Sequence, residues 1–294
     1  MTTLYEEVRA ALRESDFRPR KSRGQNFLIH ERVIDAILRL LDLSSDDRVV
    51  EIGPGLGFLT RRLLEHADGV WAIEVDSFLV DRLRAGELAA NPKFHLIHGD
   101  FLEFAPAEVL PSGPLKLAGN LPYSIATAVL FRIFEMRERF SSLVLMLQKE
   151  VADRIAAKPA TKDYGALSVW CQIHGRIADK VSVSPEAFFP RPKVRSTVLK
   201  FELFPMPLIA QTHFLALRAL VRAAFGQRRK TLGNALAAFS QHRRDEIDDW
   251  LRTQDIDPKR RGETLSIDEF IRLAGAAEGK FSPASDRQRP ATDN

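Results

Sequence analysis

The chain has 294 residues, of which 45% are hydrophobic and 28% are charged, as is typical of a soluble globular protein with room for two domains. Its 43 Lys and Arg against 39 Asp and Glu give a formal net charge of only +4, so nucleic-acid binding has to rest on local basic clusters. The single cysteine, Cys171, excludes an intrachain disulfide and favours a reducing, cytoplasmic location. Charged N-terminal residues and short apolar runs argue against a signal peptide and a membrane span.

Short β-branched runs alternate with segments of helical periodicity from Arg48 to about Phe204. This alternation predicts a doubly wound, mostly parallel seven-stranded α/β sheet. The predicted strands are 48–52, 69–75, 93–98, 115–118, 142–147, 180–183 and 196–201, and the predicted helices are 59–67, 78–88, 125–135, 151–157 and 166–173. The last two strands enclose the proline-rich loop 188–192 and form a closing pair.

The chain becomes helical after a linker at 204–207, where two prolines break regular structure. Helices are predicted at 213–224, 230–239 and 244–252, and Ser266–Glu269 fits a capping box that opens a last helix. We therefore predict a flexible basic arm over 1–24, an α/β domain over 25–204, a small all-helical domain over 208–279 and a disordered tail over 280–294.

A glycine-rich turn, Glu51-Ile-Gly53-Pro-Gly55-Leu-Gly57, directly follows the first predicted strand. Glycines let the backbone turn sharply and let a ligand approach main-chain N–H groups. The spacing is Gly-x-Gly-x-Gly and not Gly-x-Gly-x-x-Gly, which favours a nucleoside cofactor with an amino-acid end over a dinucleotide. Taken alone, the turn also fits a tight strand-to-helix connection that binds nothing.

Acidic residues end the next two strands. Glu74 is placed to accept hydrogen bonds from ribose hydroxyls, and Asp76 is its nearby competitor, with capping of the following helix as the alternative role. Asp100 is placed to accept from an adenine amino group, with Phe101 on the adenine face. Because open α/β sheets bind ligands at the carboxyl ends of their strands, these positions support one another.

The segment Asn120-Leu121-Pro122-Tyr123 follows the fourth strand. An exocyclic adenine amine is a poor nucleophile because its lone pair is delocalised into the ring. The side-chain oxygen of Asn120 and a backbone carbonyl of the turn can accept its two hydrogens, while Tyr123 stacks on the base. Methyl transfer is then direct, without a covalent intermediate or a strong base. For the tetrapeptide alone, an ordinary strand-to-turn junction is the alternative.

Several segments occur in an order that resembles the ribosomal RNA adenine dimethyltransferases, most closely those of the bacterial small subunit. The segments are Gln25-Asn-Phe-Leu28, Glu51 to Gly57, Gly119 to Tyr123, Leu147-Gln-Lys-Glu150, Tyr164-Gly-Ala-Leu-Ser168 and Phe189-Pro-Arg-Pro-Lys-Val194, with looser matches at Phe225 to Lys230 and Glu263 to Ser266. The chain departs from the family at Ser124, where the family usually has Asn, and this difference concerns fine positioning of the substrate base.

The resemblance implies a Rossmann-like class I methyltransferase domain followed by a small helical domain. It implies S-adenosylmethionine as the methyl donor. The implied acceptors are the N-6 amines of two adjacent adenosines in the 3′-terminal stem-loop of small-subunit (16S) rRNA, dimethylated during ribosome biogenesis. Phe189 would hold the base against Tyr123, with Phe188 as its rival. The implied cofactor contacts are Asn26, Leu28, Gly53, Gly55, Glu74, Asp100 and Asn120.

Basic residues cluster next to the presumed site loops and in the helical domain. A charge run is usually only a solvated surface, but three such clusters favour a track for the RNA backbone with salt-sensitive binding. The residues assigned to it are Arg20, Lys21, Arg23, Arg191, Lys193, Arg228, Arg229 and Lys230.

Two other functions remain open from the sequence. A large-subunit rRNA methyltransferase of the resistance type shares both core motifs, although Leu121 and the Phe-Pro-Arg-Pro loop lean away from it. A non-catalytic ribosome-assembly factor with the same fold is the second. The histidines show no metal-ligand spacing, so we predict no metal, and we expect a monomer.

Overall fold

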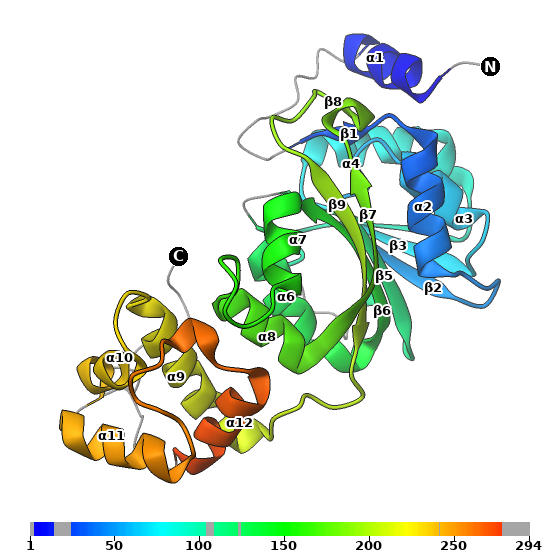
Figure 1. Cartoon of the computed structure of the whole chain (residues 1–294). Coiled ribbons are helices and arrows are strands. Elements are labelled where there is room, and N and C mark those ends of the chain that lie inside the picture. Colours follow the sequence, from blue (N-terminus) through cyan, green and yellow to red (C-terminus); the bar gives the residue numbers. More distant parts are fainter. Residues whose placement is uncertain (1–2, 15–24, 104–108, 123–124, 241, 278–294) are drawn as a thin grey trace. The chain divides into compact units, whose positions relative to one another are not determined.

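The computed structural model describes residues 3–14, 25–103, 109–122, 125–240 and 242–277 (Figure 1). The chain forms two compact units. The first comprises Met1–Ala152 and Arg176–Leu203, and the second comprises Asp153–Gly175 and Phe204–Asn294. In the part of the chain that the structure describes, no helix is long and apolar enough to cross a membrane.

A seven-stranded sheet with the order β4-β3-β2-β5-β6-β9-β7 forms the centre of the first unit. The pairs among β2, β3, β4, β5 and β6 are parallel, whereas β9 runs antiparallel to β6. The strands are β2 (Arg48–Ile52), β3 (Gly69–Glu74), β4 (Phe94–His98), β5 (Leu115–Asn120), β6 (Phe140–Gln148), β7 (Gly175–Val183) and β9 (Ser196–Leu203). The predicted α/β sheet and its closing pair of strands are confirmed.

Helices cover both faces of this sheet (Figure 1). The apolar stripes of α2 (Glu31–Leu41) and α3 (Phe58–Leu64) share one hydrophobic cluster with residues of β2, β3 and β6. On the other face lies α6 (Ala126–Glu135), where the rings of Phe134 and Phe201 are 6.0 Å apart. The predicted helix 78–88 is shorter in the structure because Gly86 is extended, which ends α4 (Ser77–Ala85) before a 3-10 turn, η2 (Glu87–Ala90).

A second, two-stranded sheet joins segments far apart in the sequence. Strand β1 (Phe27–Leu28) pairs antiparallel with β8 (Phe188–Phe189), with Phe27 opposite Phe189. The peptide bond between Phe189 and Pro190 is cis. This pairing, which the sequence did not predict, brings the segment that begins at Gln25 against the proline-rich loop.

The prediction of a flexible arm over residues 1–24 is wrong for its first part. Residues Leu4–Glu14 form helix α1, in which Val8 is fully buried and Ala11 is 5% exposed. Leu4, Val8 and Ala11 recur at the spacing of one helix face, and burial of this face orders the segment. Residues 15–24, with Arg20, Lys21 and Arg23, lie outside the described residues.

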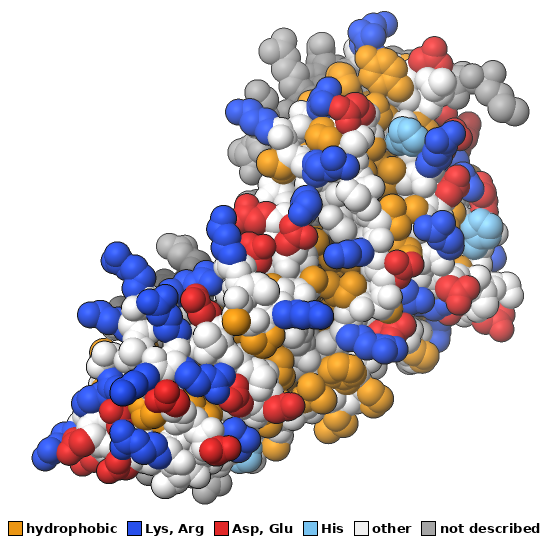
Figure 2. Space-filling model, viewed as in Figure 1, with side chains coloured by type: hydrophobic (Ala, Val, Ile, Leu, Met, Phe, Trp, Pro, Cys, Tyr) orange, Lys and Arg blue, Asp and Glu red, His pale blue; other side chains and the backbone are white. Residues whose placement is uncertain are grey.

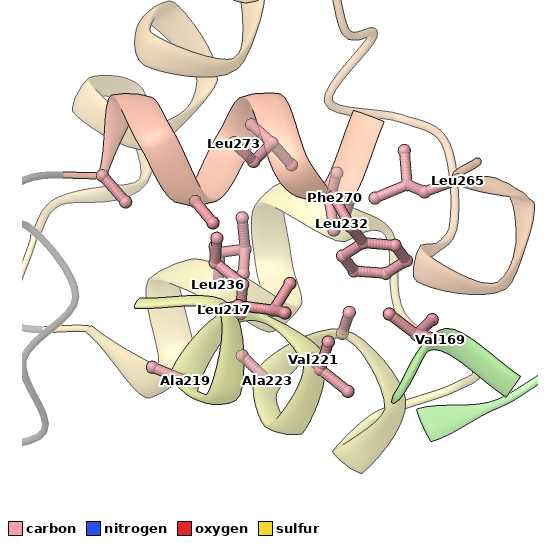
Figure 3. Packing of buried hydrophobic residues seen from close by; sticks show 14 of the residues in the cluster. Val169, Leu217, Ala219, Val221, Ala223, Leu232, Leu236, Leu265, Phe270 and Leu273 are labelled. Atoms are coloured by element: carbon pink, nitrogen blue, oxygen red, sulfur yellow. The ribbon is translucent and has the colours of Figure 1, made fainter. Parts of the chain in front are cut away.

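The second unit is all-helical and larger than predicted. Its core is formed by apolar side chains of α8, α9, α10 and α12, which point toward one another in Figure 3. The predicted capping box is confirmed, because Ser266 and Glu269 exchange hydrogen bonds of 3.1 and 2.7 Å. The helices are α8 (Ala166–His174), α9 (Phe214–Gly226), α10 (Leu232–Phe239), α11 (Arg244–Thr253) and α12 (Ile267–Ala276).

The boundary of the helical domain, predicted at residue 208, needs correction. The segment Asp153–Gly175 belongs to the helical unit although the chain later returns to the sheet. Tyr164 anchors it there: its ring is fully buried, and its hydroxyl donates to the carbonyl of Leu265 at 2.9 Å. Ser168 donates to the carbonyl of Arg154. The Tyr164–Ser168 motif is therefore structural. Helix α7 (Lys149–Ala156) spans the boundary between the units.

Candidate active site

One cavity of about 330 Å³ opens in the first unit at the carboxyl ends of β2, β3, β4 and β5, the edge where open α/β sheets bind ligands. Its volume lies within the range of small-molecule sites. The glycine turn and the Asn120 turn thus converge on one space. The predicted residues in its lining are Asn26, Leu28, Gly53, Gly55, Glu74, Asp100, Asn120 and Pro122.

The glycine turn after β2 adopts backbone angles that favour glycine. Gly53, Gly55 and Gly57 have φ values of 69°, 60° and 83°, in the region that other residues rarely adopt. A Cβ on Gly55 would come within 3.3 Å of the Phe27 ring, and one on Gly57 within 2.7 Å of Leu88, whereas one on Gly53 would meet nothing within 4 Å. Gly53 therefore leaves open space for a ligand to approach the backbone.

Glu74, at the end of β3, is 5% exposed and lines the cavity. Its carboxylate accepts from the N–H of Gly55 at 3.2 Å and from that of Asp76 at 2.9 Å. Burial raises the pKa of Glu74 against the lowering effect of these bonds. Asp76 itself caps α4 by accepting from the N–H of Phe78 at 3.1 Å. Capping of the following helix, the alternative role predicted for Asp76, is thus the role observed.

Glu51 is a second buried acid in the cavity wall. It is 2% exposed, and the hydroxyl of Thr60 donates to its carboxylate at 2.6 Å. The pKa of Glu51 is raised to about 7, mainly by burial; the hydrogen bond from Thr60 opposes this rise and the charge of Glu74 adds to it. Because an ionised Glu51 is unfavourable in the folded protein, folding favours its protonated form.

This raised pKa predicts an unusual effect of Glu51→Gln on stability. Protonation of Glu51 contributes fully to the free energy of unfolding below the unfolded pKa of 4.5, and this contribution is lost as the pH rises through about 7. Gln stays neutral and still accepts from Thr60. In urea unfolding of the free protein, the change in the free energy of unfolding caused by the substitution should be more stabilising at pH 8 than at pH 5, by about 3 kcal/mol. An equal effect at both pH values would contradict the raised pKa.

Asp100 and Phe101 follow β4 and line the same cavity. The carboxylate of Asp100 accepts from the N–H of Leu102 at 2.9 Å, which fixes its position at the strand end. Phe101 is 3% exposed. The sequence reading missed Val75, which also lines the cavity and is 50% exposed. The sequence did contain a signal for this position, because Val75 is an apolar β-branched residue directly after the strand-end acid.

Asn120 ends β5 beside the cavity, with its amide held by the N-terminal segment. Its Nδ2 donates to the carbonyl of Asn26 at 3.0 Å, which fixes the amide and leaves Oδ1 as its acceptor. Leu121 is 1% exposed, and its backbone N–H donates to Met146 at 3.1 Å. The Leu121 side chain is therefore part of the core, so only its backbone is available for chemistry. Pro122 lines the cavity.

Of the two aromatic residues predicted to hold a base, Tyr123 and Phe189, the structure describes only Phe189. Tyr123, together with Ser124, lies outside the described residues. Phe188 is 2% exposed, whereas Phe189 is half-buried and contacts the ring of Tyr5, with centroids 5.9 Å apart. Because Phe188 is enclosed in the core, the structure favours Phe189 of the two.

The predicted basic clusters are only partly available for RNA. Arg191, in the proline-rich loop, and Lys193, directly after it, are exposed, and Arg191 forms an ion pair with Glu186. Arg229 and Lys230 are also exposed. Arg228 instead donates to the carbonyl of Tyr164 at 3.0 Å and pairs with Glu263 at 3.2 Å, so its guanidinium has a structural role within the helical unit.

Among the described residues, no group of three or more His, Cys, Asp and Glu side chains is placed to hold a metal ion. The cavity instead offers the groups that a nucleoside with an amino-acid end requires. These are strand-end carboxylates for hydroxyl and amine donors, an open glycine backbone and apolar walls. The residues present thus fit S-adenosylmethionine.

The sheet order, the antiparallel pairing of β9 with β6 and the cavity at the strand ends are those of a Rossmann-like class I methyltransferase. The fold resembles a dimethyladenosine transferase from Plasmodium falciparum, with a TM-score of 0.75, 24% identity and coverage of 87% of this chain and 100% of that one. It also resembles the 23S rRNA methyltransferase ErmE, with a TM-score of 0.65, 25% identity and coverage of 86% and 100%.

Residues 16–277 match the family model described as ribosomal RNA adenine dimethylase, and the chain belongs to this family. The ribosomal RNA small subunit methyltransferase A of Geobacter metallireducens is 44% identical over 90% of this chain and 98% of its own length. The protein of the same name from Clostridium botulinum is 41% identical over 88% and 94%. The chain is therefore an rRNA adenine dimethyltransferase, an enzyme that uses S-adenosylmethionine as methyl donor.

Proposed function

We propose that the protein dimethylates the N-6 amines of two adjacent adenosines in the 3′-terminal stem-loop of small-subunit rRNA during ribosome biogenesis. The observation that carries the reaction is the convergence of the glycine turn, Glu74 and Asn120 on one cavity. The small-subunit substrate is supported by relatives that carry this name at 41–44% identity. The neighbour that acts on 23S rRNA is 25% identical.

We assign the cofactor contacts from the positions of the lining residues. Glu74 accepts from the ribose hydroxyls and Asp100 from the adenine amino group, while Val75 and Phe101 provide apolar surfaces for the adenine ring. Gly53 and Gly55 let the amino-acid end lie along the turn. When bound, the cofactor supplies an electrophilic sulfonium methyl group. The electron pair of the broken C–S bond stays on sulfur.

The protein activates the adenine amine by accepting hydrogen bonds from its two N–H groups. Oδ1 of Asn120 accepts one of these bonds, and we assign the other to the carbonyl of Leu121, since the carbonyl of Pro122 already accepts from the N–H of Ile125 at 3.2 Å. These bonds favour a lone pair directed out of the ring plane. Tyr123 and Phe189 hold the base between them. Each transfer forms an N–C bond and releases one proton from the amine to solvent. After cofactor exchange the second methyl group is transferred to the same nitrogen, which then has one N–H left to donate.

A methylation assay tests this function. Incubation with tritiated S-adenosylmethionine and unmethylated small or large ribosomal subunits should label small subunits alone, at two adjacent adenosines. Labelling of large subunits would identify the resistance-type activity. Tight binding to small subunits without label would identify an assembly factor. Either result would refute the proposed activity.

We also propose that exposed basic side chains follow the RNA backbone. Figure 2 shows many Lys and Arg side chains on the visible face of the helical unit, with acidic side chains among them. Arg229→Ala/Lys230→Ala should make the log–log salt slope of small-subunit binding shallower by about 1.4–1.8, since each neutralised phosphate contributes about 0.7–0.9. Arg252→Ala, a control at an exposed arginine paired with Asp249, should leave it unchanged. Equal slopes for the wild type, the double variant and the control would show that Arg229 and Lys230 do not contact the RNA backbone.

This assignment leaves Arg228 out because of its structural contacts. It retains Arg191, in the loop that carries Phe189, and Lys193, directly after that loop. We further propose that the enzyme acts as a monomer in the cytoplasm, where ribosomal subunits assemble.

A further inference from the structure

Helix α1 carries an exposed strip of aromatic and basic side chains beside the active site. Tyr5, Arg9 and Arg13 follow one another at four-residue intervals and therefore share one face of the helix. All three are exposed, with Tyr5 at 39%. Figure 2 shows an apolar side chain next to basic ones over α1, at the top of the view. We call these three residues the aromatic–basic strip.

The strip is connected to the cavity through one ring contact and one strand pair. Phe27 lines the cavity and lies opposite Phe189 in the β1–β8 pair. The ring of Phe189 meets that of Tyr5 edge-on, at 5.9 Å and 72°. The guanidinium of Arg9 lies over the Tyr5 ring, 5.6 Å from its centroid. Phe27 and Phe189 share one hydrophobic cluster, so aromatic residues lead from the cavity wall to the exposed ring of Tyr5.

Two of the three acidic residues of α1, Glu6 and Glu7, are engaged by other groups. Glu6 is held at the start of the helix, where it accepts from the N–H of Thr3 at 2.8 Å. Glu7 forms an ion pair with Arg61 of α3 at 3.4 Å. Burial of Val8 fixes the helix against the first unit. The strip is thus held in place, with Arg9 and Arg13 exposed on it.

We propose that the aromatic–basic strip binds the single-stranded RNA nucleotide next to the target adenosine. A planar cation on an aromatic ring marks a face on which a planar base can stack. The base would take the place of the Arg9 guanidinium on Tyr5. Arg9, an exposed side chain that changes rotamer rapidly, would then pair with a phosphate together with Arg13. This inference rests on the proposed RNA substrate.

Kinetics with unmethylated small subunits test the stacking step. Tyr5→Ala should raise KM for the subunits about tenfold, within the range that one stacked base contributes, and leave kcat and cofactor affinity unchanged. Tyr5→Phe should retain the wild-type KM, because it keeps the ring. A wild-type KM for Tyr5→Ala, or no rescue by Phe, would overturn the stacking role.

The salt dependence of binding separates the strip from general charge. Arg9→Ala should make the salt slope shallower by about 0.7–0.9, while Tyr5→Ala lowers affinity at an unchanged slope. Arg84→Ala, which removes an equal charge from an exposed site on α4, should change neither. A lower cofactor affinity or unfolding midpoint in Tyr5→Ala would instead show that Tyr5 only supports Phe189, and would overturn the proposal. Failure of the wild-type enzyme to methylate would refute the proposed function itself.

Discussion

Asn120→Ala should lower kcat about 10²–10³-fold at saturating cofactor, the usual cost of removing one preorganised hydrogen-bonding group from an active site. The side-chain oxygen that accepts from the adenine amine is lost, so the amine lone pair stays delocalised in the ring. The fold should persist, because the substitution removes one hydrogen bond, to Asn26, at the cavity edge. Single-turnover methylation of small subunits measures this effect without the contribution of product release.

Asn91→Ala provides a matched control. Asn91 lies outside the cavity, and its side chain accepts from the N–H of Lys93 in the turn before β4. Its removal should leave kcat unchanged. If Asn120→Ala also retained wild-type turnover, Asn120 would have no role in activating the amine.

Glu74→Gln should weaken cofactor binding about 10–100-fold, because a hydrogen bond to a charged group contributes about 1.5–3 kcal/mol. The carboxylate already accepts from Gly55 and Asp76, and its remaining lone pairs are available for the proposed bonds from the ribose hydroxyls. The amide nitrogen of Gln cannot accept and reduces this capacity. Calorimetric titration with S-adenosylhomocysteine measures the dissociation constant directly.

Asp76→Asn distinguishes the ribose role of Glu74 from that of its neighbour. Asp76 is 1% exposed and caps α4, and Asn is an equally good cap. Its cofactor affinity should therefore stay close to the wild-type value. Loss of affinity in Asp76→Asn, with no loss in Glu74→Gln, would move the ribose contact to Asp76.

Local sequence patterns predicted the sheet and the position of the cavity. The β-branched run before Gly53 and the acids at 74 and 100 lie where the strands end, and parallel topology brings such ends to one edge. Their assembly in one lining follows from that topology alone. The same reasoning placed Asn120 at the cavity, because it ends the neighbouring strand.

Features that depend on contacts distant in sequence were not predictable in this way. The β1–β8 sheet consists of two-residue strands, too short to have a periodic signal. The bond from Asn120 to Asn26 joins residues 94 positions apart. The sequence placed Tyr164 in the α/β domain, whereas its contact with Leu265 shows that it belongs to the helical core.

A crystal structure of the protein with S-adenosylhomocysteine is the most direct test of the shared cavity. The ribose hydroxyls should lie within hydrogen-bonding distance of Glu74, the adenine ring near Asp100, and the sulfur toward Oδ1 of Asn120. A ligand bound elsewhere, or one whose sulfur faces away from Asn120, would contradict the account.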